Sequence, residues 1–134
     1  MALLEWSPHM RLGVEVMDVA HQTLLSRLRQ LERGSNAELG RRLPELIAGM
    51  ERAFREEDAL MAAIAFPNEV RHREQHARIL CLLRIALAAV AQANPQPARD
   101  AIALMPHWFL LHLSTMDMEL SVALDVVGPL AGTL

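Results

Sequence analysis

The sequence contains little of what sheets, disulfides and membrane spans require. Its 134 residues include no tyrosine, one cysteine and only 4% aromatic residues. A single cysteine excludes an internal disulfide, and the scarcity of aromatic and β-branched residues argues against a β-rich fold. The longest apolar stretch, residues 101–113, is interrupted by Pro106, His107 and His112, and it is too short to cross a bilayer.

Positive charge and targeting signals are also lacking. The net charge is −3, which gives no electrostatic reason to expect nucleic acid or an anionic membrane as a partner. The first twelve residues do not combine a basic region with a long apolar run, so they do not resemble a secretory signal. We therefore expect a cytoplasmic protein.

Hydrophobic residues make up 52% of the chain, chiefly leucine, alanine and methionine, which favour helix. They recur at helical spacing in four segments, and short connections between long helices imply antiparallel neighbours. We predict an all-α fold, an antiparallel up-down-up-down four-helix bundle, in a single domain over residues 1–134. The predicted parts are an N-terminal arm over 1–17 and helices over about 18–33, 37–64, 67–93 and 98–127.

Local signals set these boundaries. Asp18 suits a helix N-cap, and Gly34 suits a C-terminal stop. Pro67 separates the second helix from the third, residues 94–97 form the clearest loop, and Gly128 with the following proline is expected to close the last helix.

Three other residues carry structural expectations. Pro44 either kinks the second helix or marks its first turn. Trp6 is expected to lie across the bundle as a hydrophobic anchor. Cys81, in a leucine-rich helix, is expected to be packed in the core.

Two polar residues fall on the apolar faces of the first two predicted helices. His21 follows the stripe of Leu25 and Leu28, and Glu57 is in helical phase with Ile64. A run of charges is usually a solvated face, and only this phase distinguishes Glu57 from its acidic neighbours. Both side chains are predicted to point inward.

The third predicted helix carries His72 and His76, whose spacing of four residues brings both imidazoles to one face. On a surface such a pair is often a coincidence. These two, however, lie in line with Ile79 and Leu83. Unpartnered imidazoles in a core are costly, and a bound metal removes that cost.

His112 and Asp117 lie on the fourth predicted helix. A lone histidine in an apolar run is more often a hydrogen-bonded core residue than a ligand. On an ideal helix the five-residue spacing rotates Asp117 by about 140° from His112. Either a local π-bulge brings the two together, or they reach one site from its edges.

Together these signals place four imidazoles and two carboxylates on the inner faces of four helices, where bundles hold metals. Histidine nitrogens with carboxylates able to bridge suit iron or manganese better than a closed thiolate zinc site. The candidate metal ligands are His21, Glu57, His72, His76, His112 and Asp117.

Four ordered motifs at the right separations resemble the hemerythrin family, in particular its single-domain bacterial members, over almost the whole chain. They are residues 6–24 with His21, residues 53–61 with Glu57, residues 66–76 with His72 and His76, and residues 108–117 with Trp108, His112 and Asp117. The resemblance implies two non-haem irons inside a four-helix bundle, and O2 binding at the second iron.

The resemblance also implies a division of ligands. The first iron would take three histidines, and the second would take one histidine from the first motif and one from the second. Two carboxylates and a bridging oxo or hydroxo group or water would join the irons. The resemblance thus assigns His72, His76 and His112 to the first iron and His21 to the second. It makes Glu57 and Asp117 the two bridging carboxylates.

Ala53 departs from the family pattern, because a ligating histidine is expected at this place. We consider three consequences. Two metals bind and the second has extra open or water-filled positions; or Met50 or Glu56 fills the place; or only the complete site fills, giving one metal per chain.

The leading interpretation is a non-haem iron protein that binds or senses O2, with nitric oxide and peroxide as compatible ligands. The alternatives are a di-iron oxidase or peroxidase and a mononuclear metal-binding interaction module. Residues 102–113 are apolar nearly all round the helix, more than one core-facing stripe requires. A second copy or another partner is therefore a further expectation.

Overall fold

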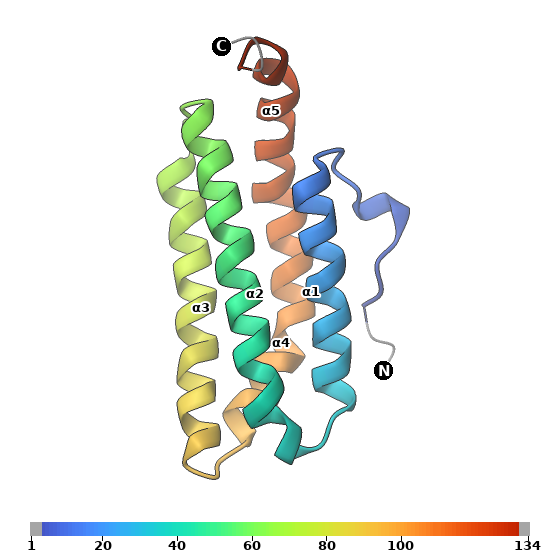
Figure 1. Cartoon of the computed structure of the whole chain (residues 1–134), viewed down its shortest axis with the longest axis vertical. Helices are drawn as coiled ribbons and strands as arrows, with labels where there is room; N and C mark the ends of the chain where they lie inside the picture. Colours follow the sequence, from blue (N-terminus) through green and yellow to red (C-terminus); the bar gives the residue numbers. More distant parts are fainter. Residues whose placement is uncertain (1–3, 132–134) are drawn as a thin grey trace.

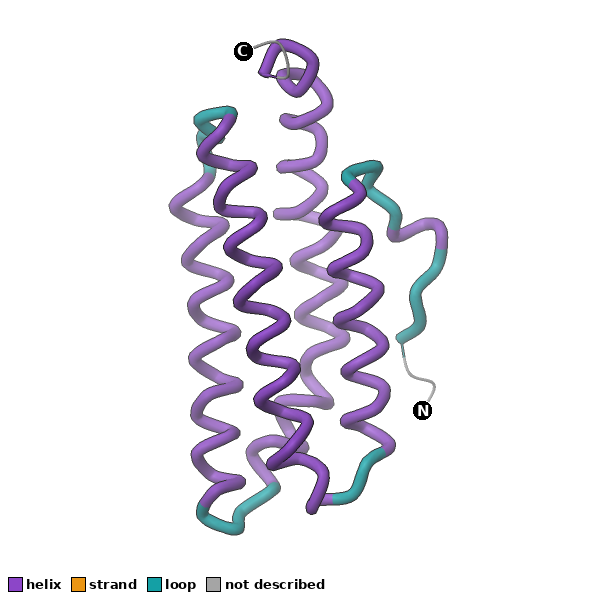
Figure 2. Tube along the Cα trace, viewed as in Figure 1, coloured by secondary structure: helices purple, strands orange, loops and turns teal. Residues whose placement is uncertain are grey.

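A computed structural model describes residues 4–131 of the chain, and these form a four-helix bundle with an N-terminal arm (Figure 1). The long helices are joined by short turns, and Figure 2 shows no strand among the described residues. The elements are η1 (Pro8–Met10), α1 (Glu15–Arg33), α2 (Asn36–Ala63), α3 (Glu69–Ala91), α4 (Gln96–His112), the π-helical turn η2 (Leu113–Asp117) and α5 (Met118–Ala131).

The helices pack in chain order, as the sequence predicts. Helix α2 packs against α1 and α3, α3 packs against α4, and α4 closes the bundle against α1. Helices α4 and α5 form one long rod, interrupted only by η2 (Figure 1). No helix among residues 4–131 is long and apolar enough to cross a membrane.

Two apolar clusters form the interior. The larger holds most of the buried leucines, and the smaller consists of Met17, Met61, Phe66 and Leu120. Along α1, His21 lies between Met17 of the smaller cluster and Leu25 of the larger. His21 thus marks a polar layer between the two apolar clusters. The clusters keep most of the surrounding water away from the polar side chains of this layer.

Apolar and polar contacts both tie the arm to the bundle. Trp6 packs against the larger cluster, which confirms its predicted anchoring role. Asp18 is not the N-cap that we predicted: α1 begins at Glu15, one turn earlier. The buried Asp18 carboxylate instead accepts backbone N–H bonds from Leu12 (2.8 Å) and Gly13 (3.1 Å). A carboxylate near a helix N-terminus is favoured electrostatically in either position.

Several other expectations were wrong in detail. Cys81 is exposed on α3, because its helical phase places it on the outer face. The last helix continues through Gly128 to Ala131. Of the two alternatives for Pro44, a kink or the first turn, the second is excluded, because Pro44 lies well inside α2. Helix α4 exposes Leu104, as its all-round apolar character led us to expect.

Helices α2 and α3 end in the same way. The Phe66 N–H bonds to the Met61 carbonyl, and the Asn94 N–H to the Ala89 carbonyl, each at 2.9 Å. This six-to-one bond is typical of a Schellman motif, which requires a left-handed residue just before its donor. Both helices place alanine there, with φ of 49° at Ala65 and 60° at Ala93. An L-residue with a Cβ is strained in this conformation.

We predict that Ala93→Gly raises the free energy of unfolding by about 1 kcal/mol, because glycine adopts positive φ without the Cβ penalty. Urea denaturation followed by circular dichroism measures the change. Ala88→Gly, at an exposed position inside α3, is the matched control and should lower stability by about 1 kcal/mol. A loss of stability in both variants would contradict the prediction.

Candidate metal centre

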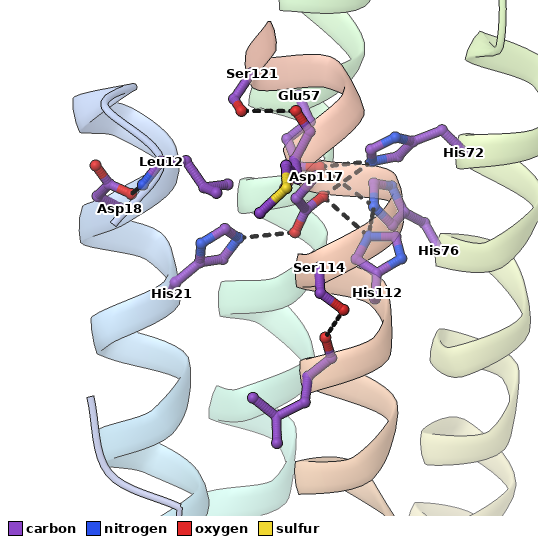
Figure 3. A network of polar contacts seen from close by, with 12 residues as sticks. Leu12, Asp18, His21, Glu57, His72, His76, His112, Ser114, Asp117 and Ser121 are labelled. Atoms are coloured by element: carbon purple, nitrogen blue, oxygen red, sulfur yellow. Dashed lines mark hydrogen bonds and ion pairs between the residues drawn. The ribbon is translucent and has the colours of Figure 1, made fainter. Parts of the chain in front are cut away.

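Five of the six predicted ligands converge in the polar layer (Figure 3). Each offers one atom, and these atoms all lie within 4.8 Å of one another, with every side chain buried. Helix α2 supplies a glutamate, α3 two histidines, and the end of α4 with η2 a histidine and an aspartate. They are Glu57, His72, His76, His112 and Asp117.

The atoms that converge are histidine nitrogens and carboxylate oxygens. The Nε2 atom of His72 lies 2.8 Å from Glu57 Oε1 and 3.3 Å from Asp117 Oδ1. The Nε2 atom of His76 lies 3.4 Å from the same glutamate oxygen, and that of His112 lies 3.1 Å from the same aspartate oxygen. The Nε2 atoms of His76 and His112 are 3.0 Å apart. Three imidazole nitrogens and two carboxylate oxygens therefore surround one small volume.

His21 reaches this cluster from the other side. Its Nε2 atom lies 3.0 Å from Asp117 Oδ2, whereas the three other histidines face Oδ1 or Glu57. Figure 3 shows His21 on α1, pointing across the bundle toward Asp117. The Asp117 carboxylate therefore lies between His21 on one side and His72 and His112 on the other.

The turn η2 explains how Asp117 joins His112 despite the five-residue spacing. Residues 113–117 are π-helical, and a π-helix bonds each residue to the fifth one along, so that positions five apart lie on one face. The π-bulge alternative, one of the two that the sequence left open, is the one observed.

Neighbouring side chains fix the orientations of two rings. Phe54 stacks on His76 with ring centroids 3.7 Å apart, and Trp108 stacks on His112 at 4.6 Å. The Gln75 amide oxygen lies 3.1 Å from His112 Nδ1. Sequence reasoning missed Gln75 altogether, because it lies off the phase of the two α3 histidines and carries no metal-binding signature of its own.

The proton count of this cluster fits a cation at its centre. The Nδ1–H of His112 donates to the Gln75 oxygen, so in the neutral ring Nε2 carries a lone pair. This lone pair faces Asp117 Oδ1, which is also a hydrogen-bond acceptor. That aspartate oxygen is buried with no hydrogen-bond partner. A metal satisfies all these lone pairs at once, and an outer partner such as Gln75 is the usual support of a ligating histidine.

Charge effects in the layer are strong. Burial disfavours the protonated form of His72, but hydrogen bonds and charges from Asp117 and Glu57 outweigh it and raise the pKa of His72 to about 9. Burial dominates for His76 and lowers its pKa. Burial also opposes ionisation of Asp117, yet the close histidines, His112 first and then His21 and His72, hold its pKa well below the usual range.

A cavity of about 610 Å³ adjoins the layer and opens between α1 and α2. Its inner end is lined by metal-type ligands, including His21 and Asp117, and its wall includes Ala53. Met50, buried, and Glu56, exposed, line the same cavity. Glu56 does not belong to the group of converging histidine and carboxylate atoms found among the described residues.

Comparison with known proteins agrees with this geometry. The family model described as "Hemerythrin HHE cation binding domain" matches residues 12–124. A bacteriohemerythrin of Ralstonia nicotianae (strain ATCC BAA-1114 / GMI1000) is 30% identical over 129 residues, covering 96% of this chain and 94% of that protein. No solved structure matches the chain.

The raised pKa of His72 predicts how the stability of the metal-free protein depends on pH. Its protonated form is held more tightly in the folded state than in the unfolded chain, whose pKa is near 6.5. The stabilisation is complete below pH 6.5 and is lost as the pH rises through about 9. We expect a fall in unfolding free energy on the order of 3 kcal/mol over this window.

Urea denaturation of chelator-stripped protein between pH 6 and 10 measures this fall. The sequence has neither lysine nor tyrosine to titrate near pH 10, which removes two common contributions to the upper end of the profile. Replacing the exposed His9 by glutamine is the control and should leave the pH profile unchanged, whereas His72→Gln should flatten it. A flat profile in the unmodified chain would refute the prediction.

Proposed function

Since the chain belongs to the hemerythrin family, we propose that it is a non-haem iron protein that binds or senses O2 at a two-metal centre. The observation that carries the proposal is the buried convergence of five ligand atoms within 4.8 Å of one another. Iron bound there supplies the redox chemistry for a diatomic or peroxide ligand.

We assign the ligands by the side of the layer on which each lies. The first metal position is held by the imidazoles of His72, His76 and His112. The second is held by His21, which faces the opposite oxygen of Asp117. Glu57 and Asp117 serve both positions and neutralise part of their charge.

The surrounding side chains hold these ligands in the orientation that metal binding requires. Stacking of Phe54 on His76 and of Trp108 on His112 prevents the two rings from turning away. The Gln75 oxygen accepts the Nδ1–H of His112 and so leaves its Nε2 lone pair free for a metal. The apolar clusters on either side limit water and strengthen the electrostatic attraction between the carboxylates and a cation.

Ala53 sets the character of the second position. A methyl group offers no ligand atom, and Ala53 lines the cavity that leads from solvent to His21. We propose that Ala53 stands in place of a ligating histidine and leaves the second iron under-liganded. A polar gap beside a cation takes up water, so that a small ligand has only to displace water there.

A di-iron oxidase or peroxidase is the second candidate. It is favoured by the same cavity, which admits molecules larger than O2. A reversible optical change on aeration and deoxygenation supports the binding function. Irreversible bleaching with consumption of a reductant supports the enzyme.

We predict that the chain binds two irons and that Ala53→His tightens the second by at least about tenfold. Iron per chain, measured after dialysis against graded chelator, reports the affinity, and the optical spectrum reports a longer-lived oxygen adduct. Ala53→Leu is the matched control, because it fills the space without adding a ligand. One iron per chain at saturating iron, or equal behaviour of the two variants, would contradict the proposal.

The assignment also predicts that His21→Leu and His76→Leu differ. Loss of His21 removes the only imidazole of the second position, so that iron content should fall from two to about one per chain. Loss of His76 should weaken the first position and thereby reduce binding at both, because the two share their carboxylates. Identical iron contents in the two variants would refute the division of ligands.

A further inference from the structure

The cavity between α1 and α2 is much larger than a diatomic ligand needs. Its volume is about 610 Å³, against roughly 30 Å³ for one water molecule in the liquid. Binding sites for small organic molecules occupy about 300–1,000 Å³. The cavity therefore has the dimensions of an organic ligand site rather than those of a gas channel.

The wall of the cavity suits an apolar molecule. Between the metal ligands and the opening it is formed by large apolar and aromatic side chains from three helices. These are Leu24, Leu46, Met50, Phe54, Trp108 and Phe109. Burying an apolar chain against them is favourable by the hydrophobic effect.

One half-buried cation on the wall lacks a counter-charge. No carboxylate among residues 4–127 lies within 4.0 Å of the Arg27 guanidinium. The nearby Arg29, by contrast, pairs with Glu5. The Arg27 guanidinium lies against the bare backbone of α2 at Gly49, where a Cβ would overlap it. A guanidinium held in this way can bind a carboxylate through two parallel hydrogen bonds.

The charges of the cavity are polarised. Arg27 lies six residues beyond His21 on α1, about 9 Å further along the helix axis. Glu15 and Glu56 line the cavity as well, and because α1 and α2 are antiparallel, both lie toward the opposite end. Arg52, the other arginine of the lining, is exposed, so solvent screens its charge more strongly. An anionic group is therefore favoured at the Arg27 end and disfavoured at the other.

We propose that this cavity binds an organic monocarboxylate with an apolar chain. The carboxylate pairs with Arg27, and the chain runs along Leu24, Met50 and Phe54 toward Ala53. The far end of the chain then lies beside His21. Its position next to a metal rests on the proposed function, whereas the binding itself needs no metal.

Octanoate is the probe, titrated by calorimetry into metal-free and iron-loaded protein. We expect saturable binding of one octanoate per chain in both forms. Arg27→Gln should weaken octanoate by about tenfold or more, since a charged hydrogen-bond pair is lost, and should leave 1-octanol unaffected. Arg29→Gln is the matched control, because Arg29 does not line the cavity, and it should leave both affinities unchanged.

A second measurement locates the ligand. In a Trp6→Phe background, Trp108 is the remaining tryptophan, and it lines the cavity. Octanoate should change its fluorescence, with the same midpoint as the calorimetric titration. Ala53→Leu, which narrows the inner half of the cavity, should weaken octanoate and 1-octanol alike.

The outcomes separate the two proposals. Binding that requires iron and ignores Arg27→Gln would mean that the carboxylate binds the metal, which overturns the Arg27 site. Absence of saturable binding would overturn it too. Arg27-dependent octanoate binding in a protein that takes up no iron would refute the proposed function alone.

Discussion

The interior of this bundle depends on an electrostatic requirement at one point. Three imidazole nitrogens and two carboxylate oxygens face one another in a layer between two apolar clusters. Lone pairs so placed repel unless a positive charge lies among them. In the metal-free chain, the proton that His72 holds supplies part of that charge, as its raised pKa indicates. In our proposal iron supplies it when bound. The packing of α1 to α4 and the π-turn can then be understood as the scaffold that keeps these ligands in register.

The scaffold is more specialised on one side of the layer than on the other. Stacked rings and Gln75 hold the α3 and α4 histidines. On the α1 side, the wall around His21 includes Ala53 and borders a large cavity. His72 and His76 thus lie away from the cavity, whereas His21 borders it. This asymmetry links the proposed under-liganded metal position with the proposed carboxylate site, because an organic molecule can approach the centre only where no protein side chain covers it.

Helical phase explains both the successes and the errors of the sequence analysis. Inward-facing positions repeat every three to four residues, so the periodicity of the chain was enough to assign His21, Glu57 and His76 to the interior. The expectation for Cys81 rested on its leucine-rich surroundings and not on phase, and it was wrong, because the thiol is exposed. Helix ends were less predictable: Asp18 is a good capping residue in isolation, but the arm uses its carboxylate instead.

The sequence by itself determined the helical class, the bundle and the six candidate ligands, because periodicity and side-chain chemistry are local properties of the chain. Only the tertiary structure decided how Asp117 reaches His112, that Gln75 supports the centre, and that Arg27 lies without a carboxylate partner beside a large cavity. Those features arise from contacts between helices that are distant in sequence. Spacing along one helix carries no information about which side chains from other helices will meet it.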